Sequence, residues 1–375
     1  MILFLILAIG LALGYVNGAN DVSKGIATLV GSGVTQYRRA IAWGTLWTGL
    51  GAFAGAFVAR AMIQTFGSGL LAVGVHATIA AALATIIGAI LWVAIATNRG
   101  LPVSTTHAIL GSILGASFLA YGMGGVNWSV LGGKVALPLL LSPVAAGGLT
   151  ALVLHAWRAW ATRSEAAHLE NDCLCVKIIQ PLEAAAGFAY ATHSSDVMPM
   201  LHLAACAANK NETTGITIKH LHWLTSGATS FARGMNDAPK MAAIVLGVAL
   251  LSGTASHVAF GYFVAIALGI LAGSWMSGQR ITEVLACEVT PMNHREGFVA
   301  NLTTAALVGC GAFLGWPMST THVASGAIGG IASTRSEKVN KKMVRTILLA
   351  WLVTLPGAAL LGAAAFMILH RAGVR

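Results

Sequence analysis

Residues 17–27 read Asn-Gly-Ala-Asn-Asp-Val-Ser-Lys-Gly-Ile-Ala and set a carboxylate, Asp21, inside a long apolar run. Residues 233–243 read Arg-Gly-Met-Asn-Asp-Ala-Pro-Lys-Met-Ala-Ala, which repeats the pattern Gly-x-Asn-Asp-x-x-Lys at an offset of 216. A second motif, Gly-x-Pro-x-Ser-Thr-Thr-His, starts at Gly100 and again at Gly315, an offset of 215. Two motifs that recur in the same order at nearly the same offset indicate an internal duplication.

The composition of the whole chain points to the membrane. Of its 375 residues, 57% are hydrophobic and 9% are charged, with a mean hydropathy of +0.78. Soluble domains carry about 25% charged residues, so we exclude a soluble enzyme, a disordered protein and a nucleic-acid binder. The net charge of +10 does not indicate nucleic acid, because the basic residues form short clusters between apolar segments. The expected environment is the lipid bilayer.

Ten apolar stretches predict about ten membrane segments in an all-α polytopic fold, since a span needs about 20 apolar residues. They are residues 2–33, 42–59, 70–97, 102–121, 129–157, 223–250, 258–277, 298–314, 317–332 and 346–369. We divide the chain into a first membrane repeat (1–157), a polar central insert (158–222) expected to be cytoplasmic, and a second repeat (223–375). Cys173, Cys175 and Cys206 in the insert match no strong zinc pattern, so we expect no metal there.

The distribution of basic residues predicts the topology. With five crossings per half and both termini outside, most Lys and Arg residues fall on the inner side, as the positive-inside rule requires. An odd number of crossings makes the two repeats inverted, and inverted repeats with broken or re-entrant helices are typical of secondary transporters. Re-entrant motif segments would leave the sidedness open. The expected location is the plasma (inner) membrane of a prokaryote.

Asp21 and Asp237 are acids placed inside apolar segments, where a charge is costly and usually functional. One interpretation is a structural ion pair of each Asp with the Lys three residues later, Lys24 or Lys240. The other is a cation or proton site. Glycine and asparagine permit a helix break that frees backbone carbonyls, so Asn20, Asp21, Asn236 and Asp237 would then offer hard oxygen ligands to Na⁺ or a proton.

The second motif predicts two helix N-termini, because Pro102 and Pro317 mark helix starts. Its hydroxyls would lie in the first turns, where free N–H groups favour anions: Ser104, Thr105, Thr106, Ser319, Thr320 and Thr321. Facing each other, the two termini would surround a tetrahedral oxyanion; ordinary serine capping is the alternative. His107 and His322 are either proton carriers or structural locks. Arg233, whose counterpart in the first half is Asn17, either attracts anions or snorkels to the inner interface, and we favour snorkelling.

These motifs resemble the inorganic phosphate transporter (PiT) family over residues 14–121 and 225–332. The resemblance implies symport of inorganic phosphate with Na⁺ or H⁺ through alternating access between inverted repeats, in a typical homodimer. It implies that the six hydroxyls hold the anion and that Asn20, Asp21, Asn236 and Asp237 hold the cation or the coupling site, with Na⁺ at Asp21 and Asp237. No enzyme activity and no cofactor beyond the coupling ion is expected.

The chain departs from the family pattern at one repeated position. An asparagine usually stands three residues after the Asp, whereas this chain has Lys24 and Lys240. A lysine ammonium there could substitute for a bound cation, and we therefore hypothesise a reduced dependence on Na⁺ and coupling to protons. Three alternatives stay open: a sulfate permease of the same fold, an anion channel, and a membrane-embedded hydrolase, which the symmetric pairing of every polar group disfavours.

Overall fold

The computed structural model describes residues 2–58, 60–163, 173–174, 216–254, 259–334 and 340–374. These residues are almost entirely helical. The first half contains α1 (Ile2–Asp21), α2 (Ser23–Gly31), α3 (Tyr37–Val58), α4 (Arg60–Gln64), η1 (Thr65–Gly69), α5 (Ile79–Asn98), α6 (Thr105–Tyr121), η2 (Met123–Gly125), α7 (Trp128–Val130), η3 (Leu131–Ala136) and α8 (Leu137–Arg163). The second contains α9 (Ile218–Leu251), α10 (Ala259–Ser277), α11 (Gln279–Glu283), η6 (Val284–Glu288), α12 (His294–Leu314), α13 (Thr320–Ser333) and α14 (Lys341–Arg371). Between them, β1 (Cys173–Leu174) and β2 (Ile216–Thr217) pair antiparallel.

Eight helical runs among the described residues are long and apolar enough to cross a membrane. They are Ile2–Gly31, Tyr37–Val58, Ile79–Asn98, Trp128–Trp160, Ile218–Leu251, Phe260–Ser277, His294–Leu314 and Lys341–Arg371. The predicted stretches 102–121 and 317–332 form α6 and α13, which are shorter, at 17 and 14 residues. Extended residues precede each of them, so the interruptions fall at the Pro-x-Ser-Thr-Thr-His motifs. The structure therefore supports a multi-span fold, with eight full-length candidates where about ten were expected.

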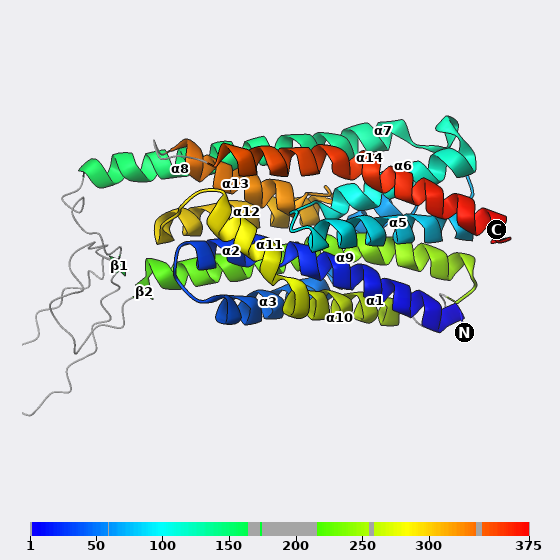
Figure 1. Ribbon diagram of the computed structural model, residues 1–375, viewed down its shortest axis with the longest axis horizontal. Helices are drawn as coiled ribbons and strands as arrows, with labels where there is room; N and C mark the ends of the chain where they lie inside the picture. The colour runs from blue at the N-terminus through cyan, green and yellow to red at the C-terminus, as the bar shows by residue number, and fades with distance from the viewer. Residues whose placement is uncertain are drawn as a thin grey trace, which may run out of the picture.

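The helices form one elongated bundle with both termini at the same end (Figure 1). The end of α8 and the start of α9 lie at the opposite end. α1 and α9 run in opposite directions along the bundle, and so do α8 and α14. Each of these pairs joins helices from corresponding places in the two halves of the chain.

Glycines allow the close helix contacts between the halves. A Cβ on Gly18 of α1 would lie 2.1 Å from the carbonyl oxygen of Ile270 in α10, and one on Gly234 of α9 would lie 2.1 Å from that of Thr48 in α3. Contacts this close between backbones need small residues, as is common for helices packed in lipid. α1 thus packs against α10, and α9 packs against α3. Around these contacts, apolar side chains of α1, α5, α6, α9 and α10 share one core.

The helix break expected at the Asn-Asp motifs is present only in the first half, where Val22 interrupts α1 and α2 while keeping helical backbone angles. In the second half this prediction is wrong, because α9 runs unbroken from Ile218 to Leu251. Pro239 removes only the hydrogen bond of one N–H group, and packing on both sides holds the helix together.

Candidate functional site

The carboxylate of Asp21 lies in a buried network of donors from three helices. Lys24 Nζ is 2.7 Å from Asp21 Oδ1, so the predicted i, i+3 ion pair is present. Asp21 Oδ2 accepts hydrogen bonds from Asn17 Nδ2 at 2.8 Å and from Thr105 Oγ1 at 2.9 Å. Asp21 is 1% exposed. Because a buried carboxylate is stable only when its oxygens have donors, this set of partners suits the ionised form.

The ammonium group of Lys24 lies among oxygen atoms. Lys24 Nζ donates to the carbonyl of Asn20 at 2.6 Å and to Asn20 Oδ1 at 2.8 Å, besides its ion pair with Asp21. Asn20 Oδ1 also accepts from the backbone N–H of Val103, and Asn20 Nδ2 donates to Thr97 Oγ1 at 2.9 Å. Asn20 therefore connects the first motif to the residues that lead into α6.

Asp237 lies in a looser version of the same arrangement. Lys240 Nζ is 3.6 Å from Asp237 Oδ1, and it donates to Thr106 Oγ1 at 2.9 Å and to the carbonyl of Met318 at 3.0 Å. Asn236 Nδ2 donates to Asp237 Oδ1 at 2.8 Å and to the same Met318 carbonyl at 2.9 Å. Lys240 thus contacts α6 of the first half and the residue before Ser319 of the second.

Asn17 joins the two carboxylates, and the sequence analysis gave it no role. Its Nδ2 donates to Asp21 Oδ2 at 2.8 Å and to Asp237 Oδ2 at 3.3 Å. The two Asn-Asp motifs, 216 positions apart in sequence, therefore meet at one point in the bundle. The signal that could have found Asn17 is its position four residues before Asp21, on the same helix face.

The N-termini of α6 and α13 also meet. Ser104 and Ser319 are the N-caps, each accepting from the backbone N–H of the histidine three residues later at 3.2 Å. Ser319 Oγ donates to Ser104 Oγ at 2.9 Å, and Thr321 Oγ1 donates to the carbonyl of Val103 at 2.7 Å. All six hydroxyl residues of the two motifs are buried: Ser104, Thr105, Thr106, Ser319, Thr320 and Thr321. The serines do cap the helices, while Thr106 and Thr321 reach across to the other half and Thr105 bonds Asp21.

The two motif histidines pack against each other. The ring centroids of His107 and His322 are 4.4 Å apart, and His322 also lies against Trp351 of α14. His107 Nδ1 is 2.8 Å from Ser104 Oγ. This hydrogen bond ties the His107 ring to the cap of its own helix. The two ring contacts of His322 join α6, α13 and α14.

Arg233 does not snorkel, and that expectation is wrong. Its side chain is 1% exposed, and one guanidinium nitrogen donates to Ser274 Oγ in α10 at 3.3 Å. The guanidinium interacts electrostatically with both Asp21 and Asp237. Close packing around Gly234 keeps α9 against α3, so the long side chain is held inside the bundle. The predicted site thus gains a fifth buried charged residue.

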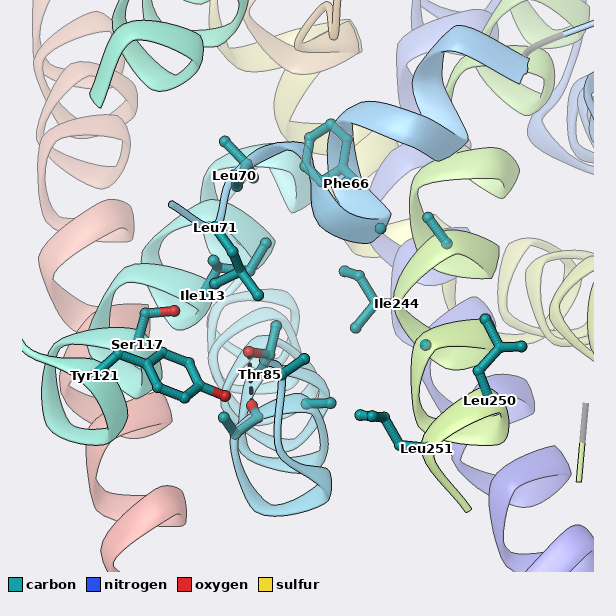
Figure 2. Close-up of a pocket in the computed structure, with 16 residues that line it drawn as sticks. Phe66, Leu70, Leu71, Thr85, Ile113, Ser117, Tyr121, Ile244, Leu250 and Leu251 are labelled. Carbon is teal, nitrogen blue, oxygen red and sulfur yellow. Dashed lines mark hydrogen bonds between the residues drawn. The ribbon is translucent and has the colours of Figure 1, made fainter. Parts of the chain in front are cut away.

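An apolar cavity near this network does not contain it. The cavity, of about 230 Å³, lies between η1, α5, α6 and α9, and Figure 2 shows Phe66, Ile113 and Ile244 among the side chains around it. Ser117 and Tyr121 add a few polar atoms. Ile244 lies one helical turn beyond Lys240 on α9. Such an apolar lining does not suit an anion, which needs charge or hydrogen-bond donors.

Within the part of the chain that the structure describes, no group of three or more His, Cys, Asp or Glu side chains could hold a metal ion. Of the insert cysteines considered for zinc, Cys173 lies in β1, and Cys175 and Cys206 lie outside the described residues, as does most of 158–222.

The chain is similar to known proteins over almost its whole length. The profile of the phosphate transporter family matches residues 17–362. A Pyrococcus abyssi protein named as a phosphate permease is 28% identical, covering 99% of this chain and 98% of its own. A Rhizobium meliloti protein named as a low-affinity inorganic phosphate transporter is 28% identical over 96% of this chain and 93% of its own. A solved structure, a sodium-dependent phosphate transporter, superposes with a TM-score of 0.78 at 25% identity, covering 99% of this chain and all of its own.

A bundle of membrane-spanning helices around a buried polar site defines a multi-pass membrane transporter. The chain belongs to the phosphate transporter family, in agreement with the resemblance noted from its motifs. Its relatives are transporters and not enzymes, which removes the hydrolase alternative.

Proposed function

We propose that this protein is a secondary active symporter that imports inorganic phosphate with H⁺ or Na⁺. The observation that carries the proposal is the meeting of two hydroxyl-bearing helix N-termini with two buried carboxylates. Ser319 Oγ bonds Ser104 Oγ across the halves, and Thr105 Oγ1 bonds Asp21. Hydroxyl and backbone N–H donors suit an oxyanion, and a carboxylate beside them can accept the O–H of phosphate, which sulfate lacks. This favours phosphate over the sulfate alternative.

We propose that the site lies between inverted repeats and works by alternating access. The opposite directions of α1 and α9, and of α8 and α14, support the inversion. The matched packing of α1 on α10 and of α9 on α3 supports it as well. Inverted repeats give a transporter two related conformations open to opposite sides. A buried network tied by ion pairs also suits an occluded site better than the continuous pore that an anion channel needs.

The two motif lysines bear on the coupling ion. A structural relative is described as sodium-dependent, and Na⁺ prefers oxygen ligands. Here the Lys24 ammonium contacts oxygen atoms of Asn20 and Asp21, and Lys240 contacts those of Thr106 and Met318. We propose that these tethered ammonium groups act in place of Na⁺ at Asp21 and Asp237, so that protons, more than Na⁺, drive uptake.

Uptake of labelled phosphate into liposomes that contain the purified protein tests the function. We expect saturable uptake that depends on an imposed pH gradient and is not suppressed by unlabelled sulfate. Uptake that never saturates and ignores every gradient would identify a channel. Accumulation of labelled sulfate in place of phosphate would identify a sulfate permease.

Substitution of both lysines tests the coupling. In the Lys24→Asn/Lys240→Asn protein we expect uptake to become dependent on Na⁺, because the substitution removes the tethered cations and supplies amide oxygens. Lys341→Asn, at the exposed start of α14, is the matched control and should leave the ion dependence unchanged. If the double variant keeps both the affinity and the ion dependence of the parent, the lysines do not replace Na⁺.

For the surroundings of the protein we propose a prokaryotic plasma membrane with both termini outside, the insert on the cytoplasmic side, and a homodimer. The prokaryotic relatives support the prokaryotic membrane. The common end of the two termini supports their placement on one side of it. The dimer rests on the family resemblance alone.

A further inference from the structure

Arg233 is a buried cation with few partners. Its guanidinium donates to Ser274 Oγ through one nitrogen, while Nε and Nη1 have no hydrogen-bond partner among the described residues. Arginine stays protonated in proteins, so the group carries its charge inside the bundle. An unpaired buried charge is strongly destabilising. The charge of Arg233 lies beside the candidate site despite this cost in folding stability, which indicates a functional role.

The buried charges around the site do not cancel. Asp21 pairs with Lys24, and Asp237 pairs with Lys240. Arg233 forms no ion pair with either carboxylate. Among the described residues, the remaining buried acid is Glu296, which lies near Arg158 at the start of α12. His107 and His322 count as neutral, because two charged rings 4.4 Å apart would repel each other. The network therefore holds one positive charge more than negative charges.

The surplus comes from one half of the duplicated sequence only. The residue at the position equivalent to Arg233 is Asn17, 216 residues earlier. Asn17 is neutral and donates to both carboxylates. The duplicated sequence thus supplies two acid–lysine pairs symmetrically and adds a single unmatched guanidinium. The packing of the two halves does not by itself require an arginine in one half and an asparagine in the other.

We propose that Arg233 is a charge-setting residue of the transport site, whose surplus positive charge balances one negative charge of the bound oxyanion. Arg233 interacts electrostatically with Asp21 and Asp237, and Asp21 accepts a hydrogen bond from Thr105 of α6, so Arg233 acts through its neighbours and is a positioning residue. A neutral complex is favoured in a medium of low dielectric constant. Without Arg233 the same anion would need one more cation. The inference rests on the proposed function and specifies how its site matches the substrate charge.

Calorimetric titration of the purified full-length protein with inorganic phosphate in Na⁺-free buffer tests the inference. We expect Arg233→Gln to weaken phosphate binding about tenfold or more, which corresponds to about 1.4 kcal/mol. Arg233→Lys should bind like the parent, because it keeps the charge. Arg233→Gln/Asp237→Asn restores the surplus of one and should bind phosphate more tightly than Arg233→Gln, even though Asp237 belongs to the proposed coupling site. Added Na⁺ should strengthen binding by Arg233→Gln more than binding by the parent.

The controls separate charge from structure. Arg345→Gln, which removes an exposed arginine of α14, should bind phosphate like the parent. Failure of both Arg233→Lys and the double variant to bind would mean that the guanidinium holds the fold, and the inference would be overturned. Unchanged binding by Arg233→Gln would overturn it too.

If Arg233→Gln does not fold, Arg233→Lys decides: parental affinity without Na⁺ supports the inference, and a tenfold loss refutes it. If the parent binds no phosphate at all, the proposed function itself is wrong and the inference falls with it.

Discussion

At the scale of single residues, the central feature is that Asn17 lies between two carboxylates. Its Nδ2 atom donates to Asp21 and to Asp237, so one amide group moderates the repulsion between two buried negative charges. Hydrogen bonds to charged groups contribute about 1.5–3 kcal/mol each. The contact also couples the two halves, because a displacement of either Asp breaks it.

We expect Asn17→Ala to lower the rate of phosphate uptake by about tenfold or more, since it leaves both carboxylates without a shared donor. Asn17→Asp should be worse, because it adds a third buried negative charge. Uptake into liposomes at equal protein content is the measurement. Gln279→Ala, which removes an amide that bonds Glu283 on the exposed surface of α11, should leave uptake unchanged. Normal uptake by Asn17→Ala would show that the carboxylates do not need the bridge.

Much of the site could be predicted from residue types. Acids in apolar segments and paired hydroxyl motifs are rare enough to be recognised in one sequence, and the structure brings Asp21, Asp237, Ser104 and Ser319 into one network. Arg233 was misjudged, because a long basic side chain in a membrane helix usually reaches an interface. Whether it does so depends on the packing of neighbouring helices, which a linear pattern does not contain.

At the scale of helices, backbone contact at glycine determines how the halves fit. Gly18 lies between the Asn17 bridge and Asn20, and it touches the backbone of α10. The position of Asp21 in the bundle therefore depends on the α1–α10 contact. The duplicated motifs indicated that two helices carry the Asn-Asp pairs. The continuity of α9 through Pro239 was not predictable, because proline in a helix usually ends or kinks it and only packing overrides that tendency.

We expect Gly18→Ala to reduce the yield of folded protein severely, because the added Cβ would lie 2.1 Å from the carbonyl oxygen of Ile270. That overlap can be relieved only by moving α1 away from α10, which also moves Asp21. Gly148→Ala in α8 is the matched control, since a Cβ there meets nothing within 4 Å. The measurement is the monodisperse fraction after size-exclusion chromatography in detergent. Equal yields of the two variants would mean that the α1–α10 contact is more adaptable than its geometry indicates.

At the scale of the whole molecule, the bundle has two distinct ends. The termini mark one end, and the end of α8 and the start of α9 mark the other. The positive-inside pattern of the sequence predicts that the second end faces the cytoplasm. An orientation of this kind cannot be read from packing, because a bundle packs equally well either way up in the bilayer. It needs a measurement on intact membranes.

Single-cysteine labelling of intact cells tests the orientation, in a background that lacks the five native cysteines. Val73 is fully exposed in the segment before α5, and Lys341 is exposed at the start of α14. Residues near Val73 share a cavity with the last turn of α9, which ends on the side of the termini, while α14 starts on the opposite side.

We expect a membrane-impermeant maleimide to label Val73→Cys on intact cells and Lys341→Cys only after permeabilisation. The reverse labelling pattern would mean that the protein has the opposite orientation in the membrane, with the insert outside. Labelling of both variants on intact cells would mean that the two ends of the bundle do not face opposite sides, which would remove the basis for the inverted repeats.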